Sequence, residues 1–218
     1  MSGTDFLYPF IEADERDVDG LLADLASSAR EKALESARLR EETAARCSDE
    51  LTRTAAAMGR AFRRGGRLFT FGNGGSATDA RLAAERFGRT RTSSGELPAV
   101  CLTDAPAVLT ALGNDVGFDL VFARTLEAIG RNGDLALGCS TSGGSHNVLR
   151  AFAVAHGRGM LTVGLAGYDG GAMAESADVD HCLVVRSQSV HRIQEAQAAL
   201  LADLASRVGA ELEGEARP

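Results

Sequence analysis

The sequence has few cysteines, no excess of basic residues and no long apolar run, and each shortage excludes a class of protein. Four cysteines are widely spaced in 218 residues, and three lie in apolar, strand-like runs. We therefore expect buried free thiols, and no disulfide framework or cysteine metal site. Acidic residues outnumber basic ones by 30 to 23, which disfavours direct nucleic-acid binding because a phosphate backbone requires a basic face. No window is long and apolar enough to span a bilayer, so we expect no membrane association.

The chain is expected to form one main domain with additions at both ends. Residues 1–14 lack the basic start and long apolar run of a signal peptide, so we expect a cytoplasmic protein. We divide the chain into an N-terminal arm with helices (1–65), a main domain (66–208) and a polar tail (209–218). The apolar spacing within residues 15–64 predicts two helices, which we expect to be an oligomerisation element. Their middle, residues 30–46, is dense in Arg and Glu and is typical of a solvated helix face.

A glycine-rich turn at residues 72–76 follows the strand-like run 68–71 and precedes a helical stretch. Glycines let the backbone turn tightly, and the unpaired N–H groups at a helix N-terminus attract an anion. The turn therefore indicates a phosphate site. The alternative is that the glycines serve the geometry of the turn alone.

A second turn, Ser140-Thr141-Ser142-Gly143-Gly144-Ser145, also lies between a strand-like run and a helical stretch. Hydroxyl and N–H groups at a helix start can together surround a phosphate, although Ser and Thr also cap helices without binding anything. Two such turns in one chain favour a shared ligand crevice, because open α/β sheets bind ligands at the carboxyl ends of their strands.

Apolar runs alternate with helical stretches along the main domain. Strands are expected at 67–72, 97–103, 134–139, 160–166 and 180–185, and helices at 77–87, 105–111, 115–129, 146–157, 170–175 and 188–208. Because the strands are apolar at consecutive positions, we expect them to be covered on both faces. This pattern predicts an α/β fold with a parallel, doubly wound sheet and right-handed crossovers.

Several short motifs occur together in the order of a known family. They are Gly72-Asn73-Gly74-Gly75-Ser76, Thr103-Asp104, Gly113-Asn114-Asp115-Val116-Gly117-Phe118, Ser140-Thr141-Ser142-Gly143-Gly144-Ser145, Asp169-Gly170-Gly171 and Arg192-Ile193-Gln194-Glu195. From about residue 15 to 208 the chain resembles the sugar isomerase (SIS) domain family, and within it the sedoheptulose-7-phosphate (phosphoheptose) isomerases and the DnaA initiator-associating protein. The resemblance implies a five-stranded parallel sheet flanked by helices, a flavodoxin-like three-layer sandwich with an N-terminal helical extension. It also implies a homotetramer with sites between subunits.

The resemblance further implies a set of residues that bind a sugar phosphate. Ser76, Ser140, Ser142 and Ser145 would hold the phosphate with Thr141 beside them. Asn73 would help to shape the crevice and contact the sugar, Gly74 and Gln194 would also bind the substrate, and Asp104 would lie near the substrate hydroxyls. For Asp104 the alternative is a turn or cap residue before Pro106.

The catalytic positions of the family are mostly changed in this chain. Where the isomerases carry the His, Glu, Gln and His that converge on zinc and substrate, this chain has Leu82, Arg86, Gln194 and Ala202. Arg86 stays protonated, so it can bind an anion but cannot be the base. One neutral amide is a poor zinc ligand, so we expect no metal and no other cofactor.

Three functions remain open. The first is a phosphosugar-binding SIS protein, without the zinc and catalytic groups of the isomerases, that acts as a sensor or has altered chemistry. The second is an aldose–ketose isomerase that uses His191, Glu195 or, after a one-residue shift along the helix, Glu85, with His146 a further titratable group near the serine loop. The third is a protein-binding scaffold like the DnaA initiator-associating protein.

Overall fold

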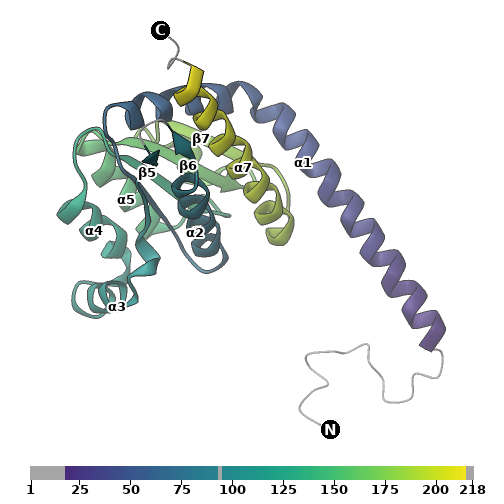
Figure 1. Cartoon of the computed structure of the whole chain (residues 1–218). Helices are drawn as coiled ribbons and strands as arrows, with labels where there is room; N and C mark the ends of the chain where they lie inside the picture. Colours follow the sequence, from purple (N-terminus) through teal and green to yellow (C-terminus); the bar gives the residue numbers. More distant parts are fainter. Residues whose placement is uncertain (1–17, 93–94, 215–218) are drawn as a thin grey trace. The chain divides into compact units, whose positions relative to one another are not determined.

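The computed structural model describes residues 18–92 and 95–214 of the chain (Figure 1). By its internal contacts the chain divides into two units, residues 1–38 and 39–218. The first described element, α1 (Val18–Arg63), is one continuous helix. The expectation of two helices in this region was wrong, because residues 30–46 contain no glycine or proline and their Arg, Glu and Ala residues favour an unbroken helix.

Five parallel strands form the central sheet, as predicted. They are β1 (Leu68–Gly72), β4 (Ala99–Cys101), β5 (Leu135–Ser140), β6 (Leu161–Gly167) and β7 (His181–Val185), in the order β4-β1-β5-β6-β7. Each lies within about two residues of a strand expected from the sequence. A short antiparallel pair, β2 (Arg91–Thr92) with β3 (Gly95–Glu96), was not predicted, since two-residue strands carry no apolar pattern.

The helices follow the strands in the alternating order that the sequence indicated. They are α2 (Gly75–Gly88), α3 (Pro106–Asp115), α4 (Val121–Ile129), α5 (His146–Gly157), α6 (Gly171–Glu175) and α7 (Val190–Gly214), with 3₁₀ turns η1 (Leu102–Asp104) and η2 (Phe118–Leu120). The expected polar tail from residue 209 is helical as far as Gly214, and residues 215–218 lie outside the described residues. In the described part of the chain, no helix has the combination of length and apolar character needed to cross a membrane.

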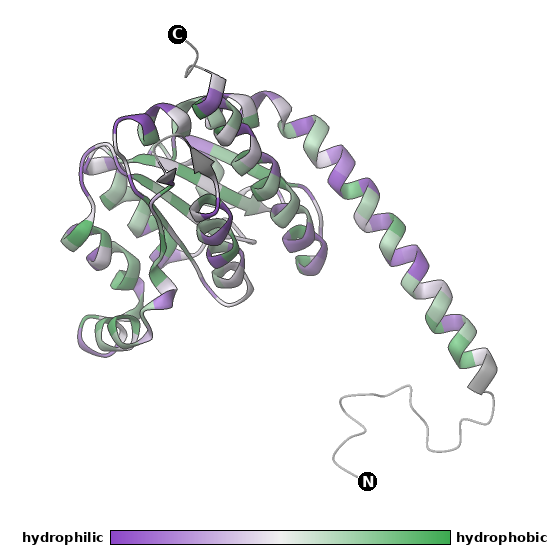
Figure 2. Cartoon of the chain, in the orientation of Figure 1, coloured by the Kyte–Doolittle hydropathy of each residue, from purple (hydrophilic) through white to green (hydrophobic). Residues whose placement is uncertain are grey.

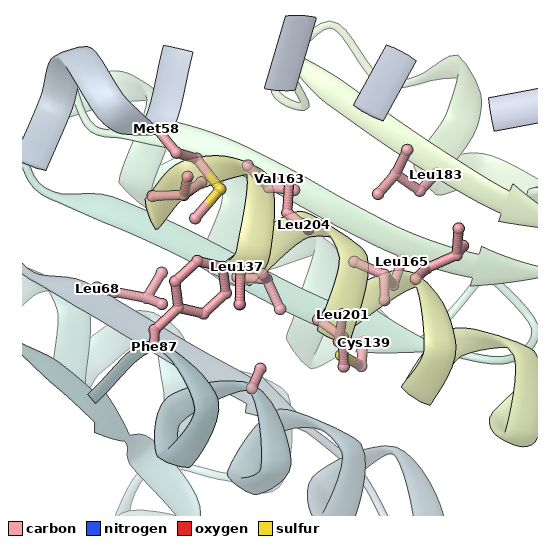
Figure 3. Close-up of a cluster of buried hydrophobic side chains, with 14 of the residues drawn as sticks. Met58, Leu68, Phe87, Leu137, Cys139, Val163, Leu165, Leu183, Leu201 and Leu204 are labelled. Carbon is pink, nitrogen blue, oxygen red and sulfur yellow. The ribbon is translucent and has the colours of Figure 1, made fainter. Parts of the chain in front are cut away.

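Side chains of the strands alternate between two apolar layers, one on each face of the sheet. Leu68, Leu137 and Leu165 pack with α2, α7 and the C-terminal part of α1, and Figure 3 shows Phe87 of α2 and Leu201 of α7 meeting strand residues in this layer. Phe69 and Phe71 belong to the opposite layer, under α4 and α5. In Figure 2 the strands are accordingly hydrophobic along most of their length. Coverage of both faces explains why the sequence shows continuous apolar runs.

A glycine in the middle of β5 makes room for the aromatic side of the core. Phe71 and Phe152 have ring centroids 5.4 Å apart. A Cβ atom on Gly138 would lie 2.6 Å from Phe152 Cζ and 2.8 Å from Phe71 Cε2. The ring pair therefore requires glycine at this position, and it anchors β1 and α5, the two elements next to the glycine-rich and serine-rich turns.

Candidate functional site

The strand order places the two predicted ligand loops side by side. β1 and β5 are neighbours in the sheet, yet the helices that follow them cover opposite faces, α2 with one apolar layer and α5 with the other. This is the switch point of a doubly wound sheet. Because the two connections leave toward opposite faces of the sheet, such folds have a crevice here, beyond the carboxyl ends of the strands. Residues 73–75 and 141–145 are the loops that follow the two strands here, so they would form the sides of the crevice that this fold predicts.

Two asparagines join the loops across the crevice. The Asn73 amide nitrogen donates to Asn147 Oδ1 at 2.8 Å, and the Asn147 amide nitrogen donates to Asn73 Oδ1 at 2.9 Å. Asn147 is buried at the start of α5. The sequence indicated that Asn73 helps to shape the crevice, but it gave no role to Asn147, because nothing in the sequence reveals that residues 74 positions apart form this pair.

The serine-rich turn is bonded within itself and to the next strand. Ser140 Oγ lies 2.9 Å from Ser145 Oγ and 3.4 Å from Ser142 Oγ, and Ser142 Oγ accepts the Gly144 N–H at 3.2 Å. The carbonyl of Thr141 accepts the N–H of Gly167 at 3.0 Å. Three of the predicted phosphate hydroxyls are thus within reach of one another.

The backbone of this turn can be built only with glycine at its centre. Gly143 has φ of 63°, and a Cβ there would lie 1.9 Å from the carbonyl oxygen of Gly170. Its own carbonyl accepts the Met173 N–H at 2.9 Å. The turn after β6, which the sequence predicted at Asp169-Gly170-Gly171, therefore supports the serine loop from behind.

Both sides of the crevice end in a helix N-terminus. Gly74, with φ of 53°, is the cap residue of α2 and has no side chain that could cap it. Ser145 is the cap residue of α5, and its hydroxyl does not bond to that helix. Ser76 is buried in the first turn of α2. The first N–H groups of a helix have no partner within the helix, and they carry partial positive charge. Two such termini beside three hydroxyls match the needs of a phosphate.

A buried carboxyl lies one turn further along α2 and was missed by sequence reasoning. Asp79 is buried, and its Oδ2 accepts the Gln194 side-chain N–H at 3.1 Å. Burial raises the pKa of the Asp79 carboxyl, and the hydrogen bond from Gln194 offsets part of that rise. Gly75 permits the contact, because a Cβ there would lie 2.3 Å from the Gln194 nitrogen. Gln194, predicted as a site residue, is therefore held at the crevice.

Comparison with known proteins identifies the family. The model of the SIS domain matches residues 33–167. The phosphoheptose isomerase of Chlorobaculum parvum is 46% identical over 173 residues, which are 78% of this chain and 82% of that protein. The chain belongs to the SIS domain family. The phosphoheptose isomerase of Roseiflexus sp. is 49% identical over 135 residues, 62% of this chain and 68% of that protein.

Solved structures agree with this SIS assignment. The phosphoheptose isomerase of Neisseria gonorrhoeae has a TM-score of 0.76 and 35% identity, and covers 84% of this chain and 98% of its own. That of Francisella tularensis has a TM-score of 0.78 and 30% identity, and covers 84% of this chain and 97% of its own. The predicted family and fold are thereby confirmed.

In this SIS domain, Leu82 and Arg86, two of the four residues that stand at catalytic positions according to the resemblance, border a cavity of about 570 Å³ between α2 and α7. Leu82, Glu85 and Arg86 contribute from α2, and Ala205 and Ser206 are among its residues from α7. The cavity thus contains Glu85, the substitute base suggested by a one-residue shift. Its carboxylate also lies 3.7 Å from the Arg81 guanidinium in an exposed ion pair.

The other predicted catalytic residues are exposed on the SIS domain surface. His191 is an exposed residue in the first turn of α7. Glu195 has a half-exposed side chain and lies 3.2 Å from Arg192. Within residues 18–92 and 95–214, no three His, Cys, Asp or Glu side chains converge as a metal site would require. The catalytic roles of these residues stay predictions.

Asp104 lies at the end of η1, after β4, and is exposed. Its carboxylate is 3.3 Å from the Arg81 guanidinium on α2. The ion pair brings the loop after β4 to the outer side of α2. The ion pair gives Asp104 a structural role. A contact between Asp104 and the substrate hydroxyls stays a prediction.

Proposed function

We propose that this SIS protein binds a phosphorylated sugar in the crevice between the glycine-rich and serine-rich loops, and that it does so without the zinc-dependent chemistry of the isomerases. Binding of a sugar phosphate is supported by the N-termini of α2 and α5, which lie next to the hydroxyls of Ser140, Ser142 and Ser145. Phosphate accepts several hydrogen bonds and carries charge, and both needs are met there. The names of the relatives, phosphoheptose isomerases, favour a sugar as the rest of the ligand.

The residues at the family's metal positions do not fit zinc. Leu82 and Ala202 have no donor atom, Arg86 is a cation, and Gln194 directs its amide nitrogen to Asp79. We therefore propose a sensor or an enzyme with altered chemistry, and derive no step that passes through a metal. The cytoplasmic location and the homotetramer expected from the resemblance belong to this proposal as well.

A binding titration tests the proposal. We expect sedoheptulose 7-phosphate to bind the purified full chain in calorimetry. Ser142→Ala should weaken binding at least about tenfold, since one hydrogen bond to a charged group contributes about 1.5–3 kcal/mol. Ser187→Ala is a matched control, because Ser187 Oγ accepts the Ser189 N–H at 3.2 Å in a similar turn outside the crevice. Equal affinity of wild type and Ser142→Ala would remove the phosphate role of the loop.

A second function is supported by Glu85. A carboxylate at the α2–α7 cavity could move a proton between the two adjacent carbons of an enediol, which is the base's task in aldose–ketose isomerisation. Under this proposal the full chain converts sedoheptulose 7-phosphate, and Glu85→Gln abolishes turnover while binding is kept. Undiminished turnover in Glu85→Gln would exclude Glu85 as the base. The third function, a protein-binding scaffold, stays a prediction from the sequence.

A further inference from the structure

The cavity between α2 and α7 lies along the same helix that begins at the phosphate loops. The two helices run side by side in the same direction: Gly75 meets Gln194 at their starts, and Thr90 meets Gly209 fifteen residues later in each. The cavity lies at the later end. Its residues are Leu82, Glu85, Arg86, Arg89, Thr90, Ala205, Ser206, Gly209, Ala210 and Glu213. The phosphate loops and the cavity thus lie at opposite ends of α2.

Two arginines give the cavity its binding chemistry. Arg86 and Arg89 both border it and are exposed, and neither guanidinium forms an ion pair with any residue that the structure describes. The acidic residues of the cavity are Glu85, which is paired with Arg81, and Glu213. A guanidinium stays charged at all relevant pH values and binds phosphate or carboxylate through paired N–H groups.

The spacing along α2 suits a single extended ligand. Ser76 and Arg86 are ten residues apart, which corresponds to about 15 Å along a helix and about 80° around it. Helical side chains lean toward the N-terminus, so the long Arg86 side chain shortens the gap to the crevice. An acidic group at the far end of a sugar phosphate would thus meet Arg86 while the first phosphate remains in the serine loop.

We propose that the Arg86–Arg89 cavity binds a second acidic group of the ligand, so that the preferred ligand is a sugar with a phosphate at one end and a phosphate or carboxylate at the other. This inference rests on the proposed function, because the first phosphate occupies the crevice. A guanidinium in this cavity is a fixed positive charge, which attracts an anion and cannot accept a proton.

Paired ligands that differ only in the second acidic group test this inference. Calorimetry on the full chain compares sedoheptulose 7-phosphate with sedoheptulose 1,7-bisphosphate, and sorbitol 6-phosphate with 6-phosphogluconate. We expect the ligand with the second acidic group to bind at least about tenfold more tightly in one pair or both, as one charge-assisted contact predicts. Preference in the first pair alone identifies a second phosphate, and preference in the second pair identifies a carboxylate.

Arginine variants locate the effect. Arg86→Gln combined with Arg89→Gln should abolish the preference within each pair, while sedoheptulose 7-phosphate still binds. Arg60→Gln is the matched control, since Arg60 is another exposed arginine in the last turn of a helix, α1. No preference in either pair, or a preference that survives the double substitution, would overturn the inference while the crevice proposal stands. Failure of all four ligands to bind would overturn both.

Discussion

Asn73 and Asn147 donate a hydrogen bond to each other, at 2.8 and 2.9 Å, and so connect the turn after β1 to the start of α5. Asn73 lies in the loop before α2 and Asn147 in the first turn of α5, and these two helices cover opposite faces of the sheet. A pair that satisfies both amides at once fixes the distance between these two segments. The crevice thereby has its width set before any ligand enters, which reduces the ordering cost of binding.

A double-mutant cycle should detect this pair. Asn73→Ala and Asn147→Ala are each expected to lower the free energy of unfolding by about 1–2 kcal/mol, since each leaves a partly buried amide unpaired. The double variant should lose less than the sum of the two, with a coupling energy of about 1 kcal/mol. Urea unfolding measures all three variants. Asn114→Ala, at an exposed amide outside the crevice, is the control, and strictly additive losses would contradict the coupling.

Asp79→Asn should stabilise the protein at neutral pH. Burial raises the pKa of the Asp79 carboxyl in the folded chain. The free energy of unfolding therefore falls as pH increases from the unfolded pKa of this group, about 3.9, through its folded pKa. An asparagine oxygen can still accept the hydrogen bond from Gln194, and it carries no buried charge. The stabilisation by Asn should therefore be present at pH 7 and diminish toward pH 4. Thermal unfolding across this range measures it, and an advantage that grows as pH falls would refute the assignment.

Gly143→Ala should remove sugar-phosphate binding. The added Cβ meets the Gly170 carbonyl at 1.9 Å, and φ of 63° disfavours any side chain. The serine loop must move, and we expect a loss of affinity of more than about tenfold together with a loss of stability of about 1–3 kcal/mol. Gly144→Ala is the control at the next position, because its nearest neighbour would be 3.8 Å away. Equal affinities of the two variants would show that the loop conformation is not required.

Gln197→Met should raise stability by about 1 kcal/mol. Gln197 is fully buried on α7, and neither its amide nitrogen nor its oxygen has a hydrogen-bond partner among the described residues. Unpaired buried polar atoms cost about 1–3 kcal/mol, and methionine has a similar shape without them. Thermal unfolding measures the change, with Gln188→Met, at an exposed glutamine, as the control. A lower melting temperature for Gln197→Met would indicate that the amide has a partner such as an internal water.

The parts of the fold that depend on local pattern were predictable. The five strands were located because consecutive apolar residues such as Leu135, Ala136 and Leu137 identify strands buried on both faces. The C-terminal end of α7 was not located. Its last turns look polar, yet Leu212 packs against the core, and the Glu211 carbonyl accepts a hydrogen bond from Arg63 at 2.9 Å. Tertiary contacts extend the helix where composition suggested a tail.

Only part of the candidate site could be predicted from the sequence. The resemblance to the SIS family predicted phosphate roles for Ser76, Ser140, Ser142 and Ser145, and these roles stay predictions. The sequence did not identify Asp79, which reads as an ordinary helix residue until Gln194, 115 positions later, is found beside it. A residue whose role comes from a distant partner carries no local signal.

By itself the sequence determined the alternation of strands and helices, the parallel sheet and the two loops at its edge, because each follows from the preferences of neighbouring residues. The tertiary structure alone decided the rest: the Asn73–Asn147 pair, the contact between Asp79 and Gln194, and the cavity that holds Arg86. These features depend on how α2, α5 and α7 pack against the sheet. Packing brings together residues that are far apart along the chain, and the distances between them are fixed by the whole core.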